Sequence, residues 1–114
     1  MADAVHAESN PVFNSRTGKT IDFVARSIQS ENGDVIFLSD REFNILKLIY
    51  EKGPAAVSRD DILDFVCRQD ESASHRSIDN SLVKIRQYLG DKEQKLIKSV
   101  RGIGYQWIGE SHES

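Results

Sequence analysis

The chain has 114 residues, of which 39% are hydrophobic and 29% charged, with a formal net charge of −3 and a pI near 5.6. This composition indicates one globular domain rather than a disordered chain. No apolar run approaches the roughly 20 residues that span a bilayer, and residues 1–11 lack the basic start and apolar stretch of a signal peptide. The single cysteine, Cys67, excludes an internal disulfide. We therefore expect a cytoplasmic protein.

The charge is distributed unevenly along the chain. Residues 75–108 carry a net charge of +4, and the remaining residues carry −7. The acidic total argues against a nucleic-acid partner, because phosphate contacts need Lys and Arg. The asymmetry nevertheless fits a basic face on an acidic body.

The N-terminal third predicts a small antiparallel sheet. Within residues 12–38, β-branched and aromatic residues gather in short runs, which turn signals at 15–19 (SRTGK) and 30–34 (SENGD) separate. We expect three or four short strands here. Residues 1–11 are expected to form a polar tail or the remnant of a linker, and residues 110–114 a C-terminal tail.

Two helices are predicted next. Ser39, followed three residues later by Glu42, forms a capping box that starts the first helix, and Gly53 with Pro54 ends it. Ser58 is the expected N-cap of the second helix, which runs to the polar loop that precedes the third helix.

The third predicted helix spans residues 75–89. Its apolar residues fall on one narrow stripe at helical spacing, and Gly90 supplies the stop. The members of this stripe are Ile78, Leu82, Ile85 and Leu89. Two β-rich runs follow, Leu96–Val100 and Tyr105–Ile108, and the short RGIG connection between them predicts a β-hairpin.

The sequence does not predict an enzyme or a metal site. Of the three histidines, His6 and His112 lie in the expected tails, and no Cys–His spacing resembles a zinc site. Gly102 and Gly104 do not form a dinucleotide fingerprint, because the third glycine position is Trp107 and the strand–turn–helix context is missing. No nucleophile is paired with a base. We expect no catalytic residue, no cofactor and no metal.

The outward face of helix 75–89 admits two interpretations. Its residues are Arg76, Asn80, Val83 and Gln87, flanked by Lys84 and Ser77. Such a face is usually a solvated surface, but these polar types also pair with base edges and phosphates in a major groove. Val83 could contact a thymine methyl group or be an ordinary scattered surface apolar residue. Two helices followed by a hairpin with Arg101 at its tip have the shape of a winged helix-turn-helix.

Four segments together resemble one family. They are LSDREFNILKLI (38–49), VSRDDILDFV (57–66), HRSIDNSLVKIRQYLG (75–90) and IKSVRGIGYQWI (97–108), and they resemble the OmpR/PhoB family of winged helix-turn-helix effector domains of bacterial response regulators. The resemblance implies an α+β fold over residues 12–109, with a four-stranded N-terminal sheet, three helices and a C-terminal wing. It also implies sequence-specific binding to double-stranded promoter DNA, usually by two protomers on direct repeats.

The resemblance implies roles for individual residues. Arg76, Lys84 and Arg86 match basic positions of the family, Arg101 matches the arginine of the wing, and Asp79 matches an aspartate that we expect to be structural. On these grounds and the exposed face, we expect DNA contacts from Arg76, Ser77, Asn80, Ser81, Val83, Lys84, Arg86, Gln87, Ser99 and Arg101.

Several positions depart from the family pattern. Ser77 and Ser99 stand where threonine is common, Ser81 where histidine is common, and Val83 where an arginine is frequent. Cys67 replaces a tryptophan that often packs at the end of the second helix, and we expect an inert thiol there rather than a redox role. These departures reduce the cationic contacts and favour an unusual target sequence.

Other interpretations remain open from the sequence. Arg76 could pair locally with Asp79, Arg86 could pair locally as well, and Tyr105 and Trp107 suit the core better than a stacking platform. By resemblance, loop 69–74 lies where family members touch RNA polymerase. The receiver domain of the family has no counterpart in this sequence, which fits either an effector half or a stand-alone regulator. A winged helix that binds a protein instead of DNA is the main rival, supported by the acidic pI and Val83.

Overall fold

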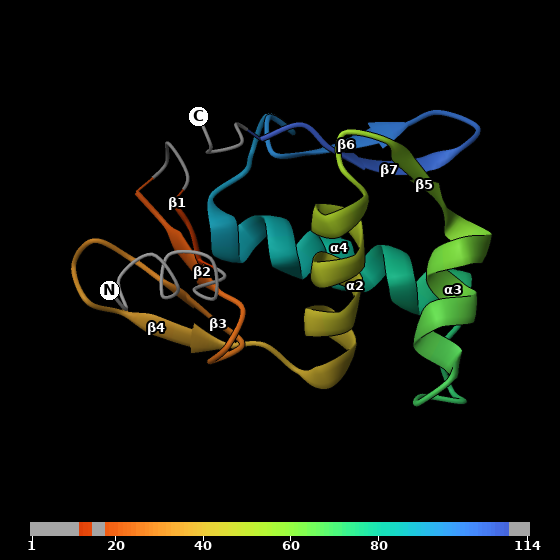
Figure 1. Cartoon of the computed structure of the whole chain (residues 1–114), viewed down its shortest axis with the longest axis horizontal. Helices are drawn as coiled ribbons and strands as arrows, with labels where there is room; N and C mark the ends of the chain where they lie inside the picture. The colour runs from red at the N-terminus through yellow and green to blue at the C-terminus, as the bar shows by residue number, and fades with distance from the viewer. Residues whose placement is uncertain (1–11, 15–17, 110–114) are drawn as a thin grey trace, which may run out of the picture.

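The computed structural model describes residues 12–14 and 18–109. Figure 1 shows a four-stranded antiparallel sheet at one end of the molecule, beside three helices and a second sheet. The first sheet has the order β1-β2-β3-β4, and its strands are Val12–Asn14, Thr20–Asp22, Ser27–Gln29 and Val35–Phe37. Ile21 pairs with Ile28 at its centre, and both side chains are fully buried. The sheet therefore contributes buried apolar side chains to the core, and its four strands agree with the predicted three or four.

The helices begin and end at the predicted caps. They are α2 (Asp40–Lys52), α3 (Arg59–Cys67) and α4 (His75–Leu89). The Ser39 hydroxyl accepts the Glu42 amide, and the Glu42 carboxylate accepts the Ser39 amide in return. Gly90 ends α4 with a φ of 70°, a left-handed conformation that glycine adopts at little steric cost. These local caps fix the helix boundaries.

The second sheet contains one strand that the sequence analysis missed. Its order is β5-β7-β6, with β5 (Ala56–Ser58), β6 (Ile97–Val100) and β7 (Gly104–Trp107). The hairpin of β6 and β7 is the predicted wing; β6 begins one residue later than predicted and ends at Val100 as predicted, and β7 is shifted by one residue at both ends. β5 joins it because Gly104 lets the backbones approach closely: a Cβ at this position would lie 2.0 Å from the Val57 carbonyl oxygen.

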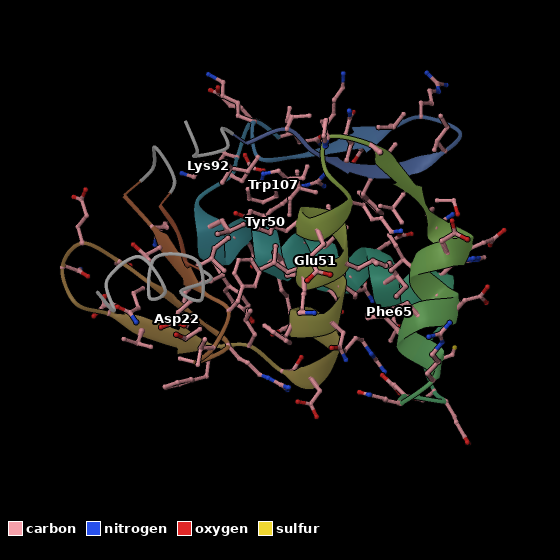
Figure 2. All side chains as sticks on the ribbon, in the orientation of Figure 1. Asp22, Tyr50, Glu51, Phe65, Lys92 and Trp107 are labelled. Atoms are coloured by element: carbon pink, nitrogen blue, oxygen red, sulfur yellow. The ribbon has the colours of Figure 1, made fainter. Side chains whose placement is uncertain are left out.

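The core lies between the two sheets and is lined by one face of α4. The four residues of the predicted stripe in α4 are all 0% exposed. Trp107 and Tyr105 are also buried, as expected, and the Trp107 ring meets the Tyr50 ring edge to face at 5.0 Å between centroids, an arrangement visible in Figure 2. In the described part of the chain, no helix has the length and apolar character needed to span a membrane.

Candidate nucleic-acid interface

Apart from the buried Ser81, the polar and charged side chains of α4 divide into two groups. One group makes hydrogen bonds within the domain through its side chains, and its members are His75, Ser77, Asp79, Arg86 and Tyr88. The second group is exposed and makes no side-chain hydrogen bond or ion pair to any residue that the structure describes. Its members are Arg76, Asn80, Lys84 and Gln87. Together with the exposed Val83, they form the surface that we name the outer face of α4.

The outer face lies opposite the buried stripe. At 100° per residue, Arg76, Asn80 and Gln87 fall on the side of the helix away from Ile78 and Leu82. Figure 1 shows α2 crossing α4, and the buried stripe is the side that packs on its neighbours. The outer face is therefore left free for a partner.

Asp79 joins three elements beside this face. Its carboxylate accepts hydrogen bonds from Arg59 Nη2 of α3 at 2.6 Å and from the Tyr105 phenol of β7 at 2.7 Å. Burial and this hydrogen bond raise the pKa of Tyr105 to about 12. Asp79 thus has the structural role that the resemblance implies, and it pairs with Arg59 rather than with Arg76.

Arg86 fastens α4 to the first strand of the wing. Its guanidinium donates to the Ile97 carbonyl from Nε at 3.1 Å and Nη2 at 2.8 Å, and Nη2 also donates to Ser99 Oγ at 3.0 Å. Its Cζ lies 5.5 Å from the centre of the Tyr105 ring, within the range of a cation–π contact. The Arg86 guanidinium and the Ser99 hydroxyl are therefore hydrogen-bonded to each other inside the domain.

The wing presents two further cations at its exposed edge. Lys98 on β6 and Arg101 in the turn are exposed, and neither side chain forms an ion pair with another described residue. Together with Ser58, His75 and Tyr105, Arg101 borders an open groove of about 600 Å³ between the wing and the N-terminal turns of α3 and α4. Asp79 also lines this groove, so Arg101 and the Asp79 junction border the same open space.

The family model for the C-terminal domain of transcriptional regulatory proteins matches residues 33–107. The chain belongs to this family. It is an OmpR/PhoB-type domain, and the family consists of transcription regulators rather than enzymes. The nisin biosynthesis regulatory protein NisR of Lactococcus lactis subsp. lactis is 38% identical over 78 residues, which cover 68% of this chain and 34% of NisR. The chain thus spans about a third of the length of this curated relative.

Two solved structures support the same assignment. The DNA-binding domain of Bacillus subtilis CssR is 27% identical, with a TM-score of 0.64 over 78% of this chain and 98% of that one. The Klebsiella pneumoniae RstA DNA-binding domain in complex with the RstA box is 26% identical, with a TM-score of 0.62 over 85% and 96% of the two chains. The expected winged-helix fold is confirmed.

Within this OmpR/PhoB-type domain, the ten expected contact residues do not share one environment. Six are exposed without a side-chain partner among the described residues: Arg76, Asn80, Val83, Lys84, Gln87 and Arg101. Three are engaged internally: Ser77 in the cap of α4, and Arg86 with Ser99. Ser81 is only 7% exposed, because its position on α4 lies beside the apolar stripe. The DNA contacts expected from all ten residues stay predictions, and the structure shows only that Ser77, Ser81, Arg86 and Ser99 differ from the other six in burial or in internal hydrogen bonds.

The sequence analysis did not single out Lys98, an exposed cation of the wing, or the two hydrogen-bond partners of Asp79. Lys98 could have been found, because strand periodicity places it opposite the buried Ile97. Arg59 and Tyr105 carry no local signal of their joint contact with Asp79, because that contact joins residues far apart in the chain.

The connector between α3 and α4 is tethered to the start of α2. Arg41 Nε donates to Asp70 at 2.6 Å, and Arg41 Nη2 donates to Ser72 Oγ at 3.1 Å. The Arg41 guanidinium and the Ser72 hydroxyl lower the pKa of Asp70 to about 2. Glu71 is exposed and makes no side-chain contact of this kind with the described residues, so it is the free carboxylate of the loop.

The remaining chemical candidates give no further site. The half-buried Cys67 thiol faces the Ala73 carbonyl, with Sγ 3.9 Å from its oxygen. Within residues 12–14 and 18–109, no cluster of three His, Cys, Asp or Glu side chains could hold a metal ion.

Proposed function

We propose that this domain regulates transcription by inserting α4 into the major groove of a specific double-stranded DNA site, with Arg101 of the wing touching the backbone or the minor groove. The division of polar side chains on α4 is the observation that carries the proposal. His75, Ser77, Asp79, Arg86 and Tyr88 are hydrogen-bonded inside the domain, whereas Arg76, Asn80, Lys84 and Gln87 remain exposed without a side-chain partner among the described residues.

The chemistry of these residues suits base and phosphate recognition. Arg and Lys bind guanine edges or phosphates, and Asn and Gln make paired hydrogen bonds with adenine in the major groove. The net charge of −3 does not oppose such binding, because Arg76 and Lys84 place positive charge on the outer face of α4 and Arg101 places it in the turn of the wing.

A salt titration tests this proposal. The dissociation constant for a duplex is measured from low to high salt for the wild type and for Lys84→Ala/Arg101→Ala. The loss of two phosphate contacts should flatten the slope of log K against log salt by about 1.8. The control variant, Lys47→Ala/Lys52→Ala, removes the same charge from α2 and should keep the wild-type slope.

Two outcomes would contradict the proposal. One is duplex binding without salt dependence, and the other is an equal response of the two double variants. A winged helix that binds a protein partner instead would keep that partner in Lys84→Ala/Arg101→Ala while showing no salt-dependent duplex binding.

The proposal extends to two protein partners in the bacterial cytoplasm, a second protomer of this chain and RNA polymerase. Two protomers are proposed to bind direct repeats of the operator. The tethered loop 69–74 is proposed to contact RNA polymerase through Glu71, because Asp70 is already paired with Arg41. In transcription with purified components, Glu71→Ala should lower promoter output without changing the dissociation constant for DNA. A native gel with one and two half-sites should show one and two bound protomers.

A further inference from the structure

Val83 is an apolar residue in the middle of an otherwise polar surface. Its side chain is 53% exposed, and it is not among the apolar residues that form the core or pack against it. Valine is a poorer helix former than the Lys or Glu that a solvated helix prefers, so neither packing nor helix propensity accounts for it. Its two nearest neighbours on the outer face are Asn80 and Gln87, which lie within one turn on either side.

The structure keeps the methyl groups of Val83 uncovered. Asp79 lies one turn before Val83, and its carboxylate is bound by Arg59 and Tyr105. Arg86 lies nearly one turn after Val83, and its guanidinium is fixed on β6. Because these two groups are bonded elsewhere, neither side chain is free to fold over Val83. The valine side chain is itself stiff, because a helix restricts it almost to one χ1 rotamer.

The spacing along α4 fits a short series of base pairs. Asn80 and Gln87 are separated by about 10 Å along the helix axis, the height of about three base-pair steps. An A·T pair presents adenine N6 and N7 to an amide side chain and a thymine C5-methyl group to an apolar one. Val83 lies between the two amides along α4, so one helix face offers an apolar group together with two amide groups.

We propose that Val83 reads the C5-methyl group of a thymine in the major groove, within a half-site whose adenines are bound by Asn80 and Gln87. The inference rests on the proposed function and deepens it, since it names the bases that the outer face of α4 selects.

Thymine-to-uracil replacement tests the contact. The wild-type chain first selects its duplex from a random pool, and each thymine of the selected site is then replaced singly by deoxyuracil, which lacks only the methyl group. At one position in each half-site, the wild-type dissociation constant should rise about fourfold. Val83→Ala should bind the thymine duplex weaker by a similar factor and should not distinguish uracil from thymine at that position.

Val24→Ala is the matched control. Val24 is 72% exposed and lies outside α4, so this variant should retain the wild-type response to uracil. Val83→Ala is expected to fold, because alanine has the higher helix propensity. Salt-dependent duplex binding with the same uracil response in wild type and Val83→Ala would overturn the thymine contact alone. Failure of the wild type to select or bind any duplex would overturn the proposed function, and this inference with it.

Discussion

The Tyr105 phenol in the wing donates a 2.7 Å hydrogen bond to the Asp79 carboxylate in α4. The same carboxylate receives Arg59 from the preceding helix. The three residues thus hold the wing, α3 and α4 in one arrangement, so the face of α4 that we propose for DNA binding is positioned by contacts within the domain. A surface that is already positioned avoids part of the entropy cost of association.

Tyr105→Phe should separate the hydrogen bond from the packing of the ring. At neutral pH the variant should lose about 1 kcal/mol of unfolding free energy. The raised pKa of the Tyr105 phenol means that the folded state favours the neutral form. The wild type should therefore lose stability as the pH rises from about 10, the pKa of a free tyrosine, through about 12.

The measurement is denaturant unfolding at several alkaline pH values, reported as wild type minus Tyr105→Phe. The difference should shrink with rising pH, because only the wild type has this phenol to ionise. A difference that stays constant through this range would contradict a buried, hydrogen-bonded Tyr105.

Arg86→Lys tests whether Arg86 acts inside the domain or on DNA. The lysine keeps the positive charge but cannot donate to both the Ile97 carbonyl and Ser99 Oγ as the guanidinium does. Unfolding free energy should fall by about 1 to 3 kcal/mol, while the salt slope of DNA binding should not change. If Arg86 binds a phosphate instead, Arg86→Ala should flatten the slope of log K against log salt by the amount expected for about one phosphate contact. Arg86→Lys should then keep the wild-type slope.

The Arg41–Asp70 ion pair predicts the titration of the α3–α4 connector. The pKa of Asp70 is lowered to about 2 in the folded domain. The ionised Asp70 carboxylate therefore stabilises the folded state above the unfolded pKa of 3.8, and this stabilisation is lost as the pH falls through about 2. In Arg41→Gln, the Asp70 carboxyl should titrate closer to 3.8, as followed by its NMR chemical shift. An unchanged titration curve in that variant would show that Arg41 does not hold the loop.

Gly104→Ala should damage the junction between β5 and the wing. A Cβ at this position would lie 2.0 Å from the Val57 carbonyl oxygen and 2.9 Å from the Ser58 Cα, and neither backbone atom can move alone. We expect a loss of about 2 kcal/mol or more in unfolding free energy. Ile103→Ala, at the neighbouring exposed position, should cost less than about 0.5 kcal/mol. Equal losses in the two variants would contradict the close approach of β5 and β7.

The helices could be predicted because their signals are local. Ser39 with Glu42 and Ser58 with Asp61 satisfy helix ends within three residues, and the stripe of α4 follows from helical spacing alone. The strand β5 was missed for the opposite reason. It has only three residues, and its pairing with β7 joins positions almost 50 residues apart, such as Val57 and Tyr105.

The candidate surface was predictable only as far as helical geometry reaches. The spacing placed Asn80 and Gln87 outside and Leu82 inside, as the structure does. It could not show that Arg86 would be bound by β6, since the partner carbonyl belongs to Ile97. Nor could helical spacing predict the burial of Ser81, which lies at the edge of the apolar stripe and is covered only when the helices pack.

Chemical-shift mapping on DNA tests the central claim most directly. Backbone amide resonances of the whole chain are followed while the selected duplex is added, and the residues that shift are located on the structure. The largest changes should fall on α4 from Arg76 to Gln87 and on the wing near Arg101, while the part of α2 around Lys47 and Glu51 should change little; Figure 2 labels Glu51 as a reference point. Changes centred on α2 or on the four-stranded sheet, with α4 unaffected, would contradict recognition through α4.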